Sequence, residues 1–206
     1  MMSKPVADMS NTKLLPFAPN IWVKDYPIRY SGCAFFGRMT VIKLEDGRII
    51  LHSPCDIDNV AKAEIDDLGG TVAFIVAPGT YHYLHVESCQ RAFPLARTYV
   101  CPGLEAKRPD LRFDGVLGDQ QPPDGDEGWG KELDQVVVKG CRFIWEVAFF
   151  HRSTRTLILV DIVENIGDQT PGTNWILRFF WKYVVFMWNN PKVRMHAQQP
   201  WRSNSS

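Results

Sequence analysis

Two of the chain's five histidines directly follow its clearest buried strand. Residues 72–77 are a continuous apolar run rich in β-branched and aromatic side chains, which is typical of a short strand buried on both faces. Pro78 and Gly79 end the run, because proline cannot donate to a sheet and glycine permits a turn. His82 and His85 come next. A loop in this position often carries chemistry in α/β proteins, and the alternative is that both histidines begin an ordinary helix.

A third histidine and a carboxylate flank a second apolar segment. Residues 157–160 are entirely apolar, and Asp161 follows them. A carboxylate there costs free energy unless it has a partner, binds a metal ion or starts the next turn. His151 precedes the segment and would either join a site or hydrogen-bond across a hairpin. Two histidines and a carboxylate suffice to hold zinc or iron with open coordination positions. The candidate metal ligands are therefore His82, His85, His151 and Asp161.

The composition argues against several other functions. The 23 Lys and Arg residues balance the 23 Asp and Glu residues and are dispersed, which gives no electrostatic footprint for nucleic acid. The sequence has no Gly-x-Ser-x-Gly, phosphate-loop or dinucleotide-binding pattern. Its five cysteines are widely separated, which favours buried thiols in a reducing, cytoplasmic compartment over disulfides or a zinc knuckle. Cys55 follows Pro54 at an expected helix start that would lower its pKa, but a buried structural thiol is favoured.

The elements that must position these residues are expected to form one domain over residues 20–189, between a disordered arm (1–19) and a disordered tail (190–206). Asp46-Gly47 lies between two apolar segments and predicts a tight hairpin. Ser53-Pro54 predicts the first turn of a helix. The other expected elements are a helix over 81–93 and strands over 21–25, 34–36, 39–44, 48–52, 97–101, 116–117, 135–138, 142–150 and 156–160.

The segment 174–188 is densely aromatic. It is too short and too charged to span a bilayer, because Arg178 and Lys182 would share one helical face. An amphipathic helix packed on the domain is the default interpretation. The alternative is a surface that docks on a partner or on a membrane. The candidate interface residues are Trp175, Phe179, Trp181 and Trp188.

The order of these elements resembles the metallo-β-lactamase superfamily, and more closely an uncharacterised branch of it, the domain of unknown function DUF4336. The order is a hairpin, a helix, a buried strand with a histidine loop, another helix and strand, and then a second hairpin that ends in Asp. The resemblance is carried by residues 38–54, 75–82, 93–103 and 146–161. It implies a mixed α/β (α+β) protein, an αββα sandwich in which two mixed sheets lie face to face with helices outside.

The resemblance also implies chemistry that this sequence matches only in part. Catalytic members bind one or two metal ions, usually zinc, through a His-x-His-x-Asp-His loop, and metal-bound hydroxide attacks the substrate. In this chain Pro78 and Thr80 stand at the first two histidine positions. His82 falls on the aspartate and Tyr83 on the last histidine of the loop. Asp161 falls where a bridging aspartate is expected.

Two functions stand open. The first is a hydrolase of an ester, thioester or lactone in a small molecule that acts through hydroxide bound to zinc, iron or manganese at a non-standard site. Whether the protein binds any metal cofactor is equally open. Asp161 and the histidines would be ligands, with His82 alternatively a proton shuttle. The second is a non-catalytic domain of the same fold that binds a partner or a membrane surface through residues 174–189. Neither function involves nucleic acid or a transmembrane segment.

Overall fold

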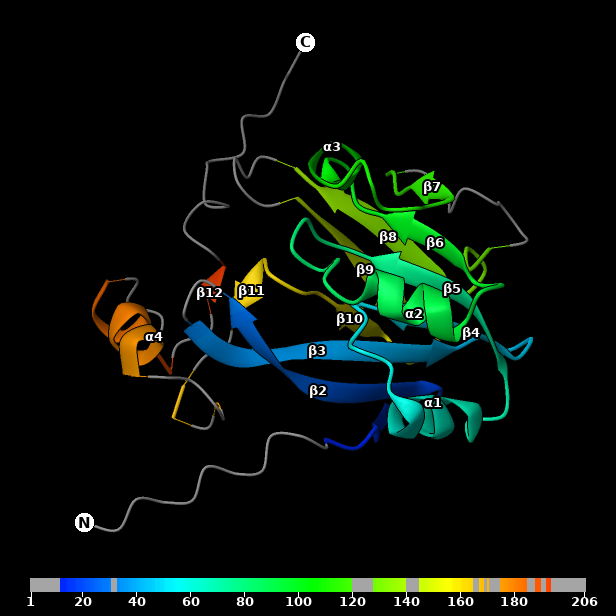
Figure 1. Ribbon diagram of the computed structural model, residues 1–206, viewed down its shortest axis with the longest axis horizontal. Helices are drawn as coiled ribbons and strands as arrows, with labels where there is room; N and C mark the ends of the chain where they lie inside the picture. Colours follow the sequence, from blue (N-terminus) through cyan, green and yellow to red (C-terminus); the bar gives the residue numbers. More distant parts are fainter. Residues whose placement is uncertain are drawn as a thin grey trace.

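The computed structural model describes residues 12–30, 33–119, 128–139, 145–164, 167–168, 170, 175–184, 188–189 and 192–193. Its strands form a seven-stranded sheet, a three-stranded sheet and a separate two-stranded pair. The pair consists of β11 (Val163–Glu164) and β12 (Lys192–Val193). Figure 1 shows these strands with α1 and α2 beside the larger sheet and α4 at the edge of the molecule.

The seven-stranded sheet follows the chain order from one edge to the other. Its strands are β1 (Leu15–Ala18), β2 (Ile21–Tyr30), β3 (Cys33–Lys43), β4 (Arg48–His52), β5 (Thr71–Ala77), β6 (Arg97–Val100) and β7 (Gly115–Val116). β1 to β4 pair antiparallel and β4 to β7 pair parallel. The parallel connections contain α1 (Asn59–Asp66), α2 (Val86–Ala92) and α3 (Leu104–Lys107). The carboxyl ends of β4, β5 and β6 therefore meet at one edge of the sheet.

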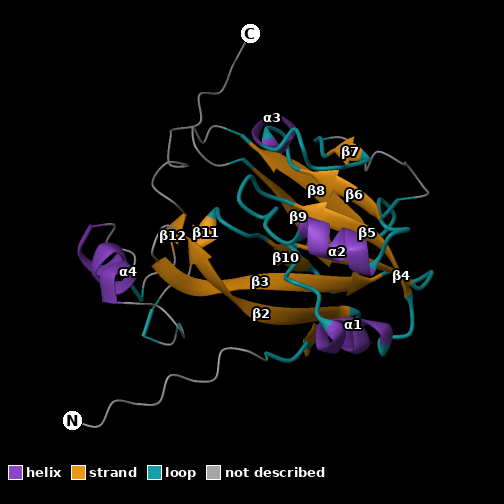
Figure 2. Ribbon diagram, in the orientation of Figure 1, coloured by secondary structure: helices purple, strands orange, loops and turns teal. Residues whose placement is uncertain are grey.

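The three-stranded sheet consists of β8 (Leu133–Val138), β9 (Glu146–His151) and β10 (Thr156–Ile158), with β9 in the centre. The indole of Trp129 lies between the sheets, with its ring centroid 5.0 Å from that of Phe74 on β5 and 6.1 Å from that of Phe149 on β9. The sheets thus share one apolar core, and in the view of Figure 2 the strands β8 and β9 of the smaller sheet overlap β5 and β6 of the larger one. This arrangement confirms the expected mixed α/β sandwich.

The helix after β4 begins later than the Ser53-Pro54 pattern predicts. Ser53 has a φ of 57°, a left-handed conformation that N-cap residues do not normally adopt. Asp58 is the N-cap of α1 instead, because its backbone is extended and its carboxylate accepts a 2.7 Å hydrogen bond from the Ala61 N–H. The expectation that Ser53 caps the helix is therefore wrong.

The expected disordered arm contains an ordered strand. Residues 15–18 form β1, because the outer edge of β2 offers backbone hydrogen-bonding partners to this segment. The expected strands 34–36 and 39–44 are one continuous strand, β3. Within the expected disordered tail, residues 192–193 form β12. Residues 1–11, 190–191 and 194–206, which complete the expected arm and tail, lie outside the described part of the chain.

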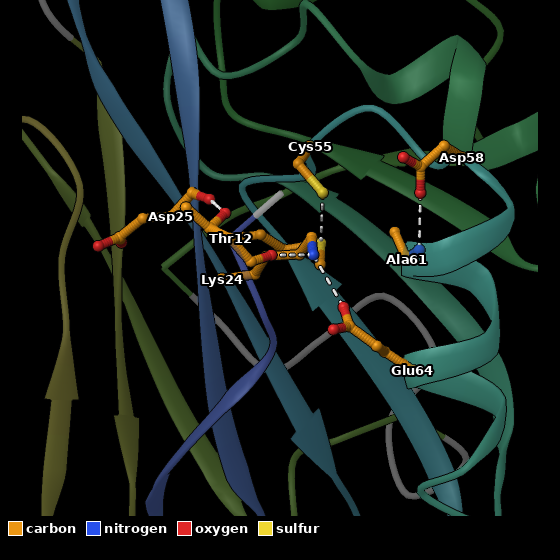
Figure 3. A network of polar contacts seen from close by, with 8 residues as sticks. Thr12, Lys24, Asp25, Cys55, Asp58, Ala61 and Glu64 are labelled. Carbon is orange, nitrogen blue, oxygen red and sulfur yellow. Dashed lines mark hydrogen bonds and ion pairs between the residues drawn. The ribbon is translucent and has the colours of Figure 1, made fainter. Parts of the chain in front are cut away.

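Polar contacts attach α1 to the sheet on the side drawn in Figure 3. The Lys24 ammonium of β2 lies 2.8 Å from the Glu64 carboxylate of α1 and also donates to the Thr12 carbonyl. Cys55 is buried beside this network, with its Sγ 3.8 Å from the sulfur of Met39. Burial raises the pKa of Cys55 to about 12, so the thiol stays protonated, and this favours the structural interpretation over a reactive one.

The N-cap assignment predicts a specific loss of stability. Replacing Asp58 with Ala leaves the Ala61 N–H without its acceptor, which we expect to lower the free energy of unfolding by about 1 kcal/mol. Asp67→Ala, at the exposed other end of α1, is the matched control and should change it by less than about 0.5 kcal/mol. Urea unfolding followed by circular dichroism measures both. Equal losses in the two variants would contradict the assignment.

Candidate functional site

Three polar side chains meet where β4, β5 and β10 end. The Ser53 hydroxyl oxygen lies 2.7 Å from His82 Nδ1, and His82 Nε2 lies 3.2 Å from an Asp161 carboxylate oxygen. The side chains of His82 and Asp161 are 14% and 22% exposed, whereas Ser53 is fully buried. The structure therefore brings together two of the four expected ligands, and adds Ser53, which the sequence pattern assigned to the start of a helix.

Ser53 is held by the end of β4. Its N–H donates to the Val76 carbonyl at 2.9 Å, which continues the parallel pairing one residue past the strand. Its left-handed backbone then turns the chain away from the sheet. The Ser53 hydroxyl also interacts with the Tyr26 side chain, and burial raises the pKa of this tyrosine, so Tyr26 is protonated at neutral pH.

His82 lies in a series of turns rather than in the helix expected over 81–93, which is restricted to α2. A Cβ on Gly79 would lie 3.0 Å from His82 Cδ2, so any larger residue would push the imidazole away by a few tenths of an ångström, and glycine lets it pack closely over the loop. The loop is also tied to β9, because the Pro78 carbonyl accepts from the Val147 N–H at 2.7 Å. The Thr80 N–H donates back to the carbonyl preceding β9 at 3.1 Å.

Asp161 is positioned by Glu146, the first residue of β9. The Glu146 carboxylate is fully buried and accepts hydrogen bonds from the N–H groups of Val160, Asp161 and Ile162 at 2.8, 2.7 and 2.8 Å. These bonds fix the segment after β10. Burial is the larger influence and raises the pKa of Glu146, although the three donors act to lower it.

Among the described residues, neither of the other two expected ligands joins His82 and Asp161 in a group that could share a metal ion. His151 is the last residue of β9, about 17 Å along the strand from Glu146 at 3.4 Å per residue. Its Nδ1 lies 2.7 Å from the Thr154 hydroxyl, so the alternative of a local hydrogen bond in the hairpin is the correct one. His85 packs its ring edge-to-face on Tyr26, with centroids 5.4 Å apart, and burial lowers its pKa.

The described residues do not fit the metal centre that the resemblance implies. Among them, no three His, Cys, Asp or Glu side chains lie close enough to share a metal ion. His82 and Asp161 supply two donors, whereas catalytic zinc sites normally have three protein ligands. The expected set of His82, His85, His151 and Asp161 is thus not assembled, because the strand and loop geometry separates its members.

Some of the expected interface residues are exposed and others are buried. Trp175 and Phe179 of α4 (Trp175–Phe179) are 76% and 55% exposed, as a docking surface requires. Trp181, in the π-helical turn η2 (Phe180–Val184), is buried and therefore attaches the helix to the domain. Trp188 is half-buried, and its indole N–H donates to the Asp168 carboxylate at 2.9 Å. In the part of the chain that the structure describes, no helix is long and apolar enough to cross a membrane.

Comparison with known proteins places the chain in a family and a fold. The model of a family described as "Domain of unknown function (DUF4336)" matches residues 20–179. A comparison with curated protein sequences gives no match. A metallo-β-lactamase from Pontibacter korlensis has a similar structure, with a TM-score of 0.59 and 13% identity over 75% of this chain and 73% of that one.

Two other metallo-β-lactamases have a similar degree of structural similarity to this chain. DIM-1 has a TM-score of 0.61 with 12% identity over 76% of this chain and 73% of its own. FIM-1 from Pseudomonas aeruginosa, in a mono-zinc form, has a TM-score of 0.51 with 10% identity over 67% of this chain and 63% of its own. At such low identity these similarities show a shared fold and leave the chemistry to be argued from the site.

One buried histidine beside the site was missed by the sequence patterns. His52 is fully buried, and its ring lies edge-to-face on Phe149 with centroids 5.1 Å apart. Neither ring nitrogen makes a hydrogen bond to any described residue. Burial, with a smaller contribution from nearby His82, lowers the pKa of His52 to about 3, so the imidazole is neutral in the folded protein.

His52 therefore predicts acid sensitivity. Below its ordinary pKa of about 6.5 the unfolded chain binds a proton that the folded chain does not, so stability falls as the pH drops toward 3. We expect wild type to lose about 1.4 kcal/mol per pH unit more than His52→Leu between pH 6 and pH 4. Urea unfolding at a series of pH values measures this slope. Parallel curves for the two proteins would contradict the prediction.

Proposed function

The chain belongs to the DUF4336 family and has the metallo-β-lactamase fold, and from this premise we propose that it is a hydrolase of an ester, thioester or lactone bond in a small molecule. His82 is the general base and Asp161 the carboxylate that orients it. The observation that carries the proposal is the 3.2 Å contact between His82 Nε2 and the Asp161 carboxylate, at the carboxyl edge of the parallel strands.

This pair suits proton transfer for two physical reasons. A carboxylate only accepts hydrogen bonds, so the proton of the neutral imidazole lies on Nε2 and Nδ1 is the basic atom. Both side chains are also partly exposed, which lets solvent reach a pair that is otherwise held rigidly by buried groups. General base catalysis by a positioned imidazole typically contributes about 10² to 10⁴ in rate.

The metal-dependent form of this hydrolase is the alternative that the fold suggests. It requires ligands beyond His82 and Asp161, and the described residues supply no third donor beside them. No step proposed here therefore passes through a metal ion. Metal content of protein purified without a chelator or a polyhistidine tag separates the two forms, and a metal-independent hydrolase should contain less than about 0.1 equivalents of zinc, iron and manganese.

The proposed function predicts that activity depends on the pair. With p-nitrophenyl acetate, an acetyl thioester and a small lactone as substrates, His82→Ala and Asp161→Asn should lower kcat/KM by about 10² or more. Asp134→Asn, an exposed carboxylate on β8 paired with Arg152, is the matched control and should retain wild-type activity. Full activity in His82→Ala, or no hydrolysis of any of the three substrates by wild type, would contradict the function.

A second function is favoured by the exposed face of the C-terminal helix. Trp175, Phe179 and Tyr183 are 76%, 55% and 55% exposed and follow one another at intervals of four residues. Arg178 and Lys182 are exposed beside them. Aromatic rings flanked by cations match the interface of an anionic bilayer, in which the rings enter the headgroup region and the cations meet lipid phosphates. We therefore propose that α4 and η2 dock on an anionic membrane surface.

Vesicle binding tests this second function. Binding to phosphatidylserine-containing vesicles should fall about tenfold or more when Trp175, Phe179 and Tyr183 are all replaced by Ala. Replacing Arg178 and Lys182 with Glu should weaken binding to these vesicles but not to pure phosphatidylcholine. Leu157→Ala, which removes an exposed apolar side chain from β10, is the control and should not change binding. Absence of binding by wild type would contradict membrane docking.

A further inference from the structure

Ser53, His82 and Asp161 form one continuous series of polar contacts: a hydrogen bond of 2.7 Å joins Ser53 to His82, and an ion-pair contact of 3.2 Å joins His82 to Asp161. Because the His82 proton lies on Nε2, toward Asp161, the Nδ1 atom at 2.7 Å accepts the proton of the Ser53 hydroxyl. A hydroxyl in contact with a base that a carboxylate orients is the arrangement by which proteins activate a serine for nucleophilic attack. Such arrangements are recognised by geometry rather than by fold or order along the chain.

The backbone of Ser53 supports the same role. A serine with a φ of 57° is held in a region that side-chain-bearing residues populate sparsely, and this costs free energy. The conformation is fixed by the bond from the Ser53 N–H to the Val76 carbonyl and by complete burial. Conformations of this kind cluster at functional sites, where they direct one side chain toward its partner. Here the partner is the basic nitrogen of His82.

We propose that Ser53 is the nucleophile of a metal-independent acyl transfer, so that hydrolysis proceeds through an acyl-enzyme; this inference rests on the proposed hydrolase function. Ser53 Oγ attacks the carbonyl carbon, and its proton passes to His82 Nδ1. The bond to the alcohol or thiol then breaks, and the leaving group takes that proton. Water next attacks the Ser53 ester, gives a proton to His82 and releases the carboxylic acid, while His82 returns the proton to Ser53.

The surroundings of Ser53 also indicate the size of the acyl group. Ser53 is fully buried, and its hydroxyl interacts with the side chains of His82 and Tyr26. Because Ser53 has no exposed surface, short acyl chains such as acetyl are favoured over long ones. The Tyr26 hydroxyl is protonated and interacts with Ser53, so it would donate a hydrogen bond to the carbonyl oxygen as negative charge develops there.

The test is the detection of an acyl-enzyme with p-nitrophenyl acetate. Rapid mixing should release roughly one p-nitrophenolate per chain before the steady state. Mass spectrometry after acid quench should find the acetyl group on the peptide that contains Ser53. His82→Ala should abolish both signals.

Ser53→Gly is the decisive variant, because glycine adopts a positive φ without strain and the protein should fold at least as well as wild type. It should lose the burst and the acetylated peptide, and its kcat/KM should fall about 10²-fold or more. Circular dichroism and thermal unfolding confirm that this loss is chemical. Tyr26→Phe should still be acetylated, but about tenfold more slowly.

The results of these experiments distinguish failure of the Ser53 nucleophile from failure of the proposed hydrolase function. If Ser53→Gly hydrolyses the ester like wild type while His82→Ala does not, Ser53 is not the nucleophile, and the hydrolase acts by direct attack of water. An acetyl group on another residue overturns the inference in the same way. If wild type hydrolyses neither esters nor thioesters, the proposed function fails and the inference fails with it.

Discussion

The candidate site depends on the burial of one carboxylate. Glu146 is fully inside the protein, where an unpaired carboxylate would cost several kcal/mol, and it accepts three backbone hydrogen bonds from residues 160–162. If the segment after β10 moved away, the buried Glu146 carboxylate would lose its three hydrogen-bond donors, which is energetically unfavourable. Because Asp161 is the middle residue of that segment, its side chain is held against His82. The geometry of the pair is therefore a consequence of packing at the start of β9.

The same end of β9 fixes the opposite half of the site. The backbone of the loop after β5 pairs with residues 145 and 147, so the two sheets are joined through main-chain hydrogen bonds at this edge. His82 comes from the loop on one sheet and Asp161 from the segment after the other. Neither sheet alone supplies the pair. The two sheets are packed together by the shared core, in which the Trp129 indole contacts Phe74 on one sheet and Phe149 on the other.

Local patterns predicted the elements but not the contacts between them. The apolar run 72–77, the Asp46-Gly47 turn and the resemblance to metallo-β-lactamases predicted β5, the β3–β4 hairpin and the fold. His151 lies at the opposite end of β9 from Glu146, and sequence proximity to the second hairpin does not show at which end of a strand a residue lies. Ser53 was missed because serine before proline is typical of a helix start, and Glu146 because its partners are 14 to 16 residues away.

The positions at which the sequence departs from the metal-binding pattern have structural roles of their own. The backbone of Pro78 and Thr80, which stand where the resemblance places two histidines, is bonded to the β9 segment, and Gly79 between them gives His82 room to pack over the loop. In this site an imidazole lies between a hydroxyl and a carboxylate. A shared fold constrains the position of a functional site more strongly than it constrains the reaction that takes place there.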